Sequence, residues 1–258
     1  MARRTNAQQR HPELSATLRQ VVEGLREQSL QCAEGDLLGS EDDLLARYRV
    51  SRPTLRQAAA LVAQEQLLQV RRGVKGGYIA RRPTSRAVAH MAAIFLRTRD
   101  TSLEELSLST APIRAELARL AATNLDETSR QALQDFLRRE AETAREEGGG
   151  FRAFAKSERE FGQVLGAASG NHVLSLFLDI LFDLAANIPP EHDLFLGRPD
   201  RVENYRERRA RLVEAILSGD PSVASLLSYR VTELSQQWRD EDGAGPRPVA
   251  ALGQAAAR

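Results

Sequence analysis

Apolar residues recur at helical spacing along most of this 258-residue chain, and the period changes to that of strands in one region only, residues 67–80. One face of the first predicted helix, which ends near Leu30, carries Leu14, Leu18, Val21, Val22 and Leu25. From Ser85 onward the periodicity predicts helices at about 85–98, 102–123, 126–146, 151–169, 171–187, 200–218 and 221–240. The sequence therefore predicts a mainly α protein whose larger part is an all-α antiparallel helical bundle.

A short second helix is predicted after a loop through Gly35. Ser40 and Asp43 have the spacing of a capping box, in which each residue satisfies a free backbone N–H of the first helical turn. Arg49 and Val50 then form the turn that leads to the next helix.

The third helix and the strands complete a recognisable motif. Ser51 can cap this helix, and Pro53 lies in its first turn, where a missing N–H costs nothing. The helix is predicted to end at about Gln64, and residues 67–72 and 77–80 then have the pattern of two short strands around a glycine-containing turn. Three helices and a two-stranded wing predict a winged helix-turn-helix in front of the bundle.

Two arginines, Arg52 and Arg56, lie one turn apart at the start of the third helix. In a helix-turn-helix the second helix of the motif enters the major groove of DNA by its N-terminal residues. A guanidinium can bond a guanine edge or a phosphate through two parallel hydrogen bonds. We therefore predict that both arginines contact DNA, with Ser40, Ser51 and Thr54 as further DNA-binding residues near helix N-termini.

The turn between the two strands supplies the rest of the predicted DNA contacts. Gly76 and Gly77 let the backbone pass close to a duplex, while Arg71, Arg72 and Lys75 add positive charge for the phosphates. The alternative interpretation is that these arginines lie on a solvated face and the hairpin is only a hairpin. The turn is not a nucleotide-binding loop, because it lacks both the dinucleotide pattern and a Gly-Lys-Ser/Thr ending.

Charge is divided unevenly between the two parts of the chain. Residues 1–86 carry 15 Lys and Arg against 9 Asp and Glu, whereas residues 87–258 carry 21 against 26. A basic segment joined to an acidic one is expected when the first part binds a polyanion. No apolar run approaches the ~20 residues of a membrane span, and no secretion signal begins the chain, so we expect a cytoplasmic protein without a membrane partner.

Residues 14–80 resemble the DNA-binding domain of the GntR-type bacterial transcription regulators. The resemblance rests on "GDLLGSEDDLLARYRVSRPTLRQAAALVAQEQLLQVRRGVKGGYIA". It implies that Arg52, Thr54 and Arg56 are the contacts of the recognition helix and that the turn at residues 75–77 is the tip of the wing.

The sequence departs from that family at two positions of the second helix. The family commonly has a proline and a DNA-contacting arginine where this chain has Gly39 and Asp42. The departure implies that one DNA contact is lost and that the operator is atypical.

The later helices resemble the effector-binding domain of the FadR-like subgroup, called the FCD domain, through "LARLAATN", "FGQVLGAASGNHVL" and "RLVEAILSGDPSVA". The resemblance implies a winged helix-turn-helix at 10–82, an effector-binding and dimerisation domain at 83–241 and a flexible tail at 242–258. It also implies a homodimeric, ligand-responsive repressor on a near-palindromic operator. An architectural DNA-binding protein and a helical-bundle enzyme remain as alternatives, the second without a recognisable catalytic motif.

Many members of that subgroup hold a divalent metal with one Asp and three His, and the ligands do not match here. The Asp position has Glu158, the first His position Gly162, the second about Arg209, and the third Arg230 or Val231. We expect no cofactor, and we expect structural or surface roles for the four histidines of the chain, His11, His90, His172 and His192.

Arginines at histidine positions change what such a cavity can bind. A partly buried arginine needs an anionic partner, and Glu158 could be that partner. We therefore expect an effector site at Glu158, Arg209 and Arg230 for a small organic anion, either a carboxylate or an acyl-coenzyme A. The alternatives are that the two arginines face solvent, or that the protein senses a metal through atypical ligands.

Overall fold

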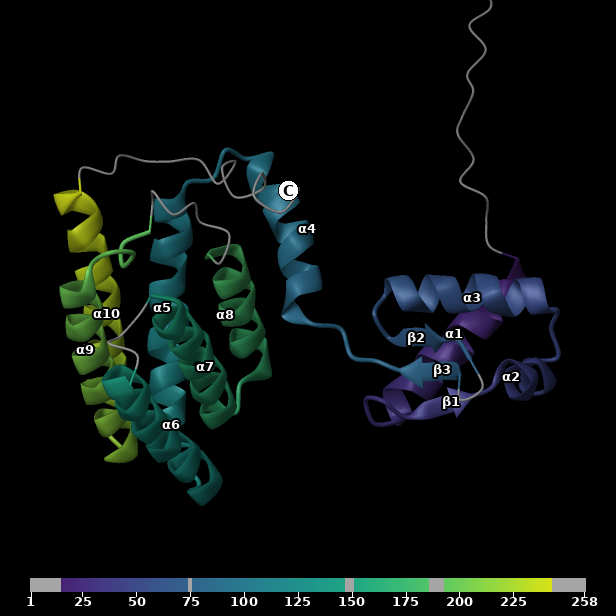
Figure 1. Cartoon of the computed structure of the whole chain (residues 1–258), viewed down its shortest axis with the longest axis horizontal. Helices are drawn as coiled ribbons and strands as arrows, with labels where there is room; N and C mark the ends of the chain where they lie inside the picture. The colour runs from purple at the N-terminus through teal and green to yellow at the C-terminus, as the bar shows by residue number, and fades with distance from the viewer. Residues whose placement is uncertain (1–14, 74–75, 147–150, 186–192, 243–258) are drawn as a thin grey trace, which may run out of the picture. The chain divides into compact units, whose positions relative to one another are not determined.

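The computed structural model describes residues 15–73, 76–146, 151–185 and 193–242. The chain divides into two compact units, Met1–Thr84 and Ser85–Arg258 (Figure 1). The predicted tail after residue 242, the wing residue Lys75, and His11 and His192 lie outside the described residues.

The N-terminal unit contains three helices and a small sheet. Its elements are α1 (Ala16–Gln31), β1 (Leu37–Gly39), α2 (Glu41–Tyr48), α3 (Arg52–Gln64), β2 (Leu68–Arg71) and β3 (Gly77–Ala80). Helices α1 and α3 pack against each other around a core that includes Leu25, Leu44 and Leu55. The predicted winged helix-turn-helix is confirmed, and its helices begin and end within about two residues of the predicted positions.

Side-chain caps fix where these helices begin. The Ser15 hydroxyl accepts a hydrogen bond from the Leu18 N–H at the start of α1. Ser40 and Asp43 form the predicted capping box, in which Asp43 accepts from the Ser40 N–H at 2.9 Å. Arg49 has the left-handed backbone conformation, φ 55°, that turns the chain from α2 into α3.

The sheet of this unit has one strand more than the predicted two-stranded wing. Its order is β1-β3-β2, with both pairs antiparallel, so the short strand β1 covers the other edge of β3. Only Leu38 of β1 is buried. A three-residue strand is too short to show the alternation from which strands are predicted, which is why the sequence indicated a loop here.

The C-terminal unit is a bundle of antiparallel and crossing helices with no strand among its described residues. Its helices are α4 (Ser85–Arg97), α5 (Leu103–Thr123), α6 (Glu127–Glu146), α7 (Phe151–Ser169), α8 (His172–Ala185), α9 (Pro199–Leu217) and α10 (Pro221–Glu241). Helix α5 contacts α7, α8, α9 and α10 and is therefore the central helix of the unit. The predicted all-helical bundle is confirmed.

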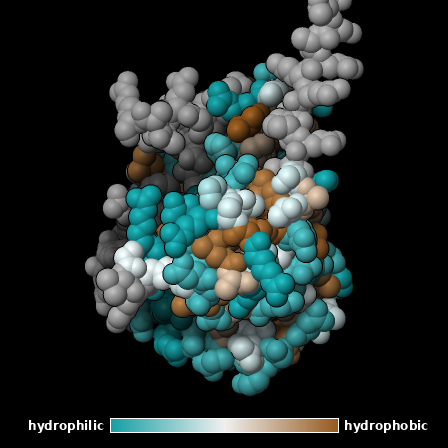
Figure 2. All heavy atoms as spheres, turned by 90° about the vertical axis from the view of Figure 1, so that its right-hand side faces the viewer, coloured by the Kyte–Doolittle hydropathy of each residue, from teal (hydrophilic) through white to brown (hydrophobic). Residues whose placement is uncertain are grey.

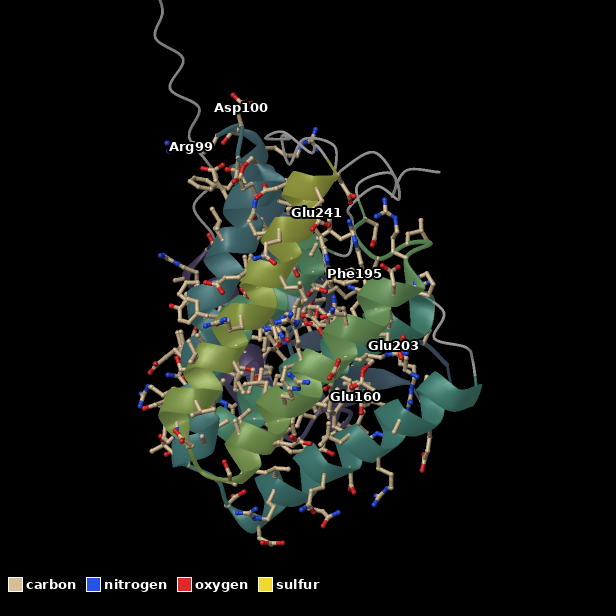
Figure 3. All side chains as sticks on the ribbon, turned by 90° about the vertical axis from the view of Figure 1, so that its left-hand side faces the viewer. Arg99, Asp100, Glu160, Phe195, Glu203 and Glu241 are labelled. Carbon is tan, nitrogen blue, oxygen red and sulfur yellow. The ribbon has the colours of Figure 1, made fainter. Side chains whose placement is uncertain are left out.

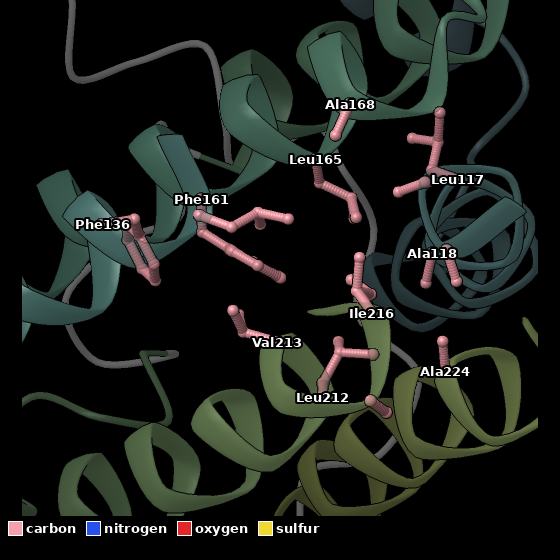
Figure 4. Close-up of a cluster of buried hydrophobic side chains, with 14 of the residues drawn as sticks. Leu117, Ala118, Phe136, Phe161, Leu165, Ala168, Leu212, Val213, Ile216 and Ala224 are labelled. Atoms are coloured by element: carbon pink, nitrogen blue, oxygen red, sulfur yellow. The ribbon is translucent and has the colours of Figure 1, made fainter. Parts of the chain in front are cut away.

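One apolar core fills the half of the bundle that contains the loop between α9 and α10 (Figure 4). Phe136 of α6 and Phe161 of α7 contact each other there with ring centroids 5.3 Å apart, and Leu117, Leu165 and Leu212 are completely buried beside them. A second cluster at the other half contains Phe154, Tyr205 and Trp238. None of the described helices is long and apolar enough to span a bilayer.

Candidate functional site

The start of α3 presents the two predicted recognition arginines to solvent. The side chains of Arg52 and Arg56 are 63% and 67% exposed. The buried side of the same helix consists of Leu55, Ala58, Ala59 and Val62, which fixes the helix to the unit and leaves the arginines outward. Their position matches the residues by which such a helix reads the major groove.

Each of these arginines is bonded to a carboxylate of the preceding helix. Nε and Nη2 of Arg56 donate to the two oxygens of Glu41 at 2.7 and 3.2 Å. Nη2 of Arg52 donates to Oδ1 of Asp42 at 3.2 Å. The hydrogen bonds between Arg56 and Glu41 raise the pKa of the guanidinium and lower the pKa of the carboxyl, so this pair is charged at neutral pH.

The three predicted hydroxyl contacts take part in capping. The Ser51 hydroxyl accepts from the Thr54 N–H at 3.4 Å, and its oxygen lies 2.9 Å from the Thr54 hydroxyl oxygen. The Ser40 hydroxyl donates to Asp43 at 2.6 Å and accepts from the Asp43 N–H. These side chains therefore stabilise the N-termini of α2 and α3, the helices that carry the carboxylates and the arginines.

A groove of about 840 Å³ runs between α3, the start of α2 and the wing. The predicted residues Ser40, Arg56, Arg71, Arg72 and the glycines of the wing line it, together with Glu41, Ala59, Ala60, Val70 and Tyr78. Figure 2 shows a face of this unit, on which hydrophilic side chains surround a smaller hydrophobic area. The groove brings the recognition helix and the wing charges to one side of the unit.

The wing glycines are required by the packing of the turn itself. A Cβ on Gly76 would lie 2.3 Å from the carbonyl oxygen of Arg71, and one on Gly77, φ 152°, would lie 2.6 Å from Leu37. Gly39 has φ 150° and pairs with the strand that begins at Gly77. Proline cannot adopt that angle. The backbone conformation at position 39 therefore explains why this chain has glycine where the family commonly has proline.

The C-terminal unit places Glu158 and Arg209, the predicted effector residues, in direct contact inside the bundle. Nη1 of Arg209 donates to Oε2 of Glu158 at 2.5 Å. The arginine is completely buried and the Glu158 side chain is 16% exposed. Burial, and then the charge of Arg114, lower the pKa of Arg209 to about 9, so its guanidinium is still charged at neutral pH.

Helix α5 and a second residue of α9, Tyr205, also contribute to this site. Nη1 of Arg114 on α5 donates to Oε1 of Glu158 at 2.8 Å and to the Tyr205 hydroxyl at 2.7 Å. The Tyr205 hydroxyl donates to the same carboxylate oxygen at 2.6 Å. Burial raises the pKa of Tyr205 against the opposing charge of Arg114, so the phenol stays protonated and can donate.

Glu140 of α6 closes the other side of the site. It pairs with Nη2 of Arg209 and accepts from the Ser157 hydroxyl at 3.0 Å, and Nε of Arg206 lies 3.5 Å from it. Figure 3 shows many side-chain nitrogen and oxygen atoms gathered between α9 and α10 in the middle of the bundle. We call this set of residues the buried charge cluster; its members are Arg114, Glu140, Ser157, Glu158, Tyr205, Arg206 and Arg209.

The buried charge cluster pairs carboxylates with guanidiniums but leaves some guanidinium donors without acceptors. Glu158 pairs with Arg114 and Arg209, and Glu140 pairs with Arg209 and lies 3.5 Å from Nε of Arg206. Nε and Nη2 of Arg114 and Nε of Arg209 are buried without a hydrogen-bond partner in the described part of the chain. A buried donor without an acceptor costs free energy, and a bound anion would supply acceptors for these donors.

Aromatic rings surround the most buried guanidinium of the cluster. Its carbon Cζ lies 5.2 to 5.8 Å from the ring centroids of Phe136, Phe154, Phe161 and Tyr205. The negative faces of such rings favour a cation and exclude water. The surrounding rings therefore stabilise the charged form of Arg209 in an apolar environment.

The structure does not bring the third predicted effector residue to this site. Arg230 is 62% exposed on α10 and lies 3.9 Å from Glu233, whereas its neighbour Val231 is buried against the second core. The prediction that Arg230 faces the cavity is not supported, because the helical period at this point directs Val231 inward. At the other unmatched position, a Cβ on Gly162 would lie 2.2 Å from the ring of Phe182, which fills the space of a histidine.

The His, Cys, Asp and Glu side chains of the described residues are not arranged as the ligands of a metal ion. Among residues 15–73, 76–146, 151–185 and 193–242, no three side chains of His, Cys, Asp or Glu gather as a metal site would need. His90 and His172 are exposed on α4 and α8.

Sequence reasoning missed five members of the cluster: Arg114, Glu140, Ser157, Tyr205 and Arg206. A signal was present for Arg114, since it occupies an inward position of α5 between the buried Ala111, Ala115, Leu117 and Ala118. A charged residue on the apolar face of a helix needs a partner from another helix. Which helix supplies the partner depends on the tertiary packing.

Comparison with known proteins gives three findings. A family model described as the FCD domain matches residues 110–233. The HTH-type transcriptional repressor NanR of Escherichia coli K12 is 28% identical over 232 residues, which cover 86% of this chain and 84% of the relative; NanR of Citrobacter rodentium is 27% identical with 86% and 85% coverage. The solved structure of Streptococcus agalactiae GntR has the same fold, with a TM-score of 0.65, 18% identity, and coverage of 85% of this chain and 99% of that chain.

Proposed function

This chain belongs to the FCD subgroup of the GntR-type transcription regulators, and on that premise we propose that it is a repressor that binds a near-palindromic operator as a homodimer and is released by a small organic anion. Its relatives are transcription regulators and not enzymes. We assign DNA binding to residues 10–82 and effector binding and dimerisation to 83–241. A regulator of this kind acts where the chromosome is, so we place it in the cytoplasm.

One observation supports the DNA-binding role most strongly. The exposed Arg52 and Arg56 lie one helical turn apart at the N-terminus of the second helix of a helix-turn-helix, beside a groove that also contains Arg71 and Arg72. The N-terminal end of that helix is the part that meets base edges in the major groove. The strand ends supply the phosphate contacts that hold the unit in register on the duplex.

The test of this role uses DNA from the source genome. Fragments of that genome are mixed with the full-length protein, and the bound fragments are recovered and sequenced. The proposal expects strong enrichment of a few sites that share two inverted half-sites, because a two-fold dimer imposes its symmetry on the operator. If all fragments were recovered in equal amounts, sequence-specific regulation would be contradicted and an architectural DNA-binding protein would be favoured.

Exposed apolar side chains on two packed helices support the homodimer. Helices α4 and α8 contact each other, and they expose Val88, Met91 and Phe95 on the first and Val173 and Phe177 on the second. Apolar surface of this kind is covered in assemblies, and a two-fold interface uses the same patch on both copies. We propose that a second copy of this chain covers the α4/α8 surface.

A charge placed on this surface tests the dimer. The double variant Phe95→Glu and Phe177→Glu is expected to sediment as a monomer at concentrations where the wild type is a dimer. Leu226→Glu is the matched control, because Leu226 is similarly exposed, at 54%, on α10 of the same unit. Equal sedimentation of the double variant and the wild type would place the dimer contact elsewhere.

The buried charge cluster supports an anionic effector. Nε and Nη2 of the buried Arg114 lack an acceptor in the described part of the chain, in a cluster that also contains the buried guanidinium of Arg209. A carboxylate accepts two parallel hydrogen bonds from a guanidinium. We propose that the carboxylate of a small organic acid, or an acyl-coenzyme A, binds at Arg114, Glu158 and Arg209, and that Arg230 takes no part.

The effector test measures thermal stabilisation of the full chain by a set of carboxylates and acyl-coenzyme A esters. Each carboxylate is paired with its uncharged amide, which keeps the size and removes the charge. A ligand that binds only the folded state raises the melting temperature. The proposal expects an acid to stabilise the wild type and Arg230→Gln but not Arg114→Gln, and it fails if amides stabilise equally or if Arg114→Gln responds like the wild type.

A further inference from the structure

We propose that Glu41 and Asp42, the first two residues of α2, determine which bases the recognition helix reads. Glu41 is a positioning residue for Arg56, and Asp42 is a base-contacting acceptor that selects an amino-bearing base, cytosine first, beside the base read by Arg52. The proposal rests on the DNA-binding role above and names the contacts that make it selective.

The geometry of Arg56 leaves one face of its guanidinium for DNA. Glu41 takes Nε and one N–H of Nη2, which form one edge of the guanidinium plane. The remaining N–H groups on Nη1 and Nη2 form the end-on edge, with two parallel donors at the spacing of O6 and N7 of guanine. Since the Glu41 side chain is only 29% exposed while Arg56 is 67% exposed, the carboxylate is the inner member and the arginine the outer one. The ion pair therefore orients Arg56 so that its free N–H groups can bind a guanine.

The geometry of Asp42 differs, because this carboxylate is the outer member of its pair. Its side chain is 81% exposed and accepts a hydrogen bond from Nη2 of Arg52 at 3.2 Å. A carboxylate at a DNA surface repels phosphate oxygens, but it can accept from the N4 amino group of cytosine. An exposed Asp beside a DNA-reading arginine is thus suited to accept a hydrogen bond from a base edge and unsuited to contact the DNA phosphates.

Both pairs also lower the attraction of α3 for phosphates in general. Each arginine carries its compensating negative charge within hydrogen-bond distance, so neither contributes a full free charge to non-specific binding. Non-specific affinity and its salt dependence grow with the number of phosphates that free cations neutralise. The α2 carboxylates therefore exchange general affinity for base selectivity.

The other role open to these residues is to stabilise the N-terminus of their own helix. Glu41, Asp42 and Asp43 form the acidic first turn of α2, where negative charge favours the helix dipole. Asp43 serves this role through the capping box with Ser40. The bonds of Glu41 and Asp42 instead leave the helix and end on α3, which helix stabilisation alone does not require.

The test compares base preferences from selection on duplexes with one randomised half-site. The full-length wild type, Asp42→Asn, Asp42→Glu and Glu41→Gln are used with Glu27→Gln as the matched control, because Glu27 is an exposed glutamate on α1 whose change removes the same charge from the same unit. Circular dichroism spectra and melting temperatures confirm that each variant is folded.

The proposal expects separate effects for the two residues. Asp42→Asn reduces the preference for cytosine over other bases at one position of the half-site by about 5- to 100-fold, the discrimination that one base-edge contact provides, and Asp42→Glu restores most of it. Glu41→Gln weakens the guanine preference at a different position, and the log–log salt slope steepens by about one as Arg56 turns to a phosphate. Glu27→Gln changes neither preference.

Two results would overturn the proposal, and they differ from a failure of DNA binding itself. If Asp42→Asn and Glu41→Gln keep the base preferences of the wild type and change affinity only as Glu27→Gln does, the two carboxylates are helix N-terminal charges alone. If the wild type itself shows no base preference, the proposed regulator function fails first and this inference fails with it.

Discussion

Replacing Glu158 by Gln is expected to destabilise the C-terminal unit by about 3 kcal/mol. Glu158 accepts hydrogen bonds from Arg114, Tyr205 and Arg209 at 2.5 to 2.8 Å and is the carboxylate between the two buried guanidiniums of Arg114 and Arg209. Breaking a buried ion pair by removing one partner costs about 3–5 kcal/mol, since an uncompensated charge remains buried. The amide of Gln keeps the volume and one acceptor, so the lower end of this range applies.

The single tryptophan of the chain makes the measurement specific to this unit. Trp238 is 7% exposed in α10 and its ring contacts Phe195, so its fluorescence reports unfolding of the bundle and not of the N-terminal unit. With a urea m-value of about 1–3 kcal/mol/M, a loss of 3 kcal/mol lowers the unfolding midpoint by roughly 1–3 M. Protomer concentration is held constant, because a dimer contributes to the apparent stability.

Glu160→Gln provides the matched control on the same helix. Glu160, labelled in Figure 3, pairs with Arg139 at the surface, where the two side chains are 36% and 51% exposed. Exposed pairs contribute about 0–1 kcal/mol, so the midpoint should shift little. Equal, small shifts for Glu158→Gln and Glu160→Gln would refute the claim that Glu158 compensates the buried positive charge of Arg114 and Arg209.

Two further predictions concern the wing. Gly77→Ala is expected to cost the N-terminal unit about 1–3 kcal/mol, because the φ of 152° is strained for alanine and the new Cβ would also meet Leu37 at 2.6 Å. Gly73→Ala, at φ 106°, carries backbone strain as well, but its Cβ meets nothing within 4 Å, so thermal unfolding followed by circular dichroism should show the larger loss for Gly77→Ala. Arg71→Ala is expected to weaken binding to all duplexes alike and to reduce the log–log salt slope by about one, and a loss confined to one DNA sequence would show that Arg71 reads bases instead.

The elements that the sequence predicted are those fixed by interactions between residues close together in the chain. Helix α3 was predicted with its N-cap, its proline and its two outward arginines, because all of these depend on neighbours within one or two turns. The same holds for the capping box of Ser40 and Asp43. Strand β1 was not predicted, since its three residues form a strand only by pairing with β3, some forty residues further along the chain.

The candidate sites divide in the same way. That Arg52 and Arg56 would be exposed follows from helical spacing, but their bonds to Asp42 and Glu41 depend on how α2 crosses α3. For the bundle, the sequence indicated that arginine replaces histidine near position 209. It could not indicate that the partners come from α5, α6 and α7, because long-range packing alone brings these helices together.

The measurement that tests the central claim most directly is the affinity of the full-length protein for the duplex upstream of its own gene and for a scrambled duplex of equal length. Fluorescence anisotropy is followed across a salt series for the wild type, Arg52→Ala and Arg56→Ala. A specific regulator should prefer the native duplex by about 10³-fold or more. Each substitution should remove about 1–3 kcal/mol from binding to the native duplex and much less from binding to the scrambled one. Equal losses on both duplexes would contradict base reading by α3 and would reduce the two arginines to phosphate anchors.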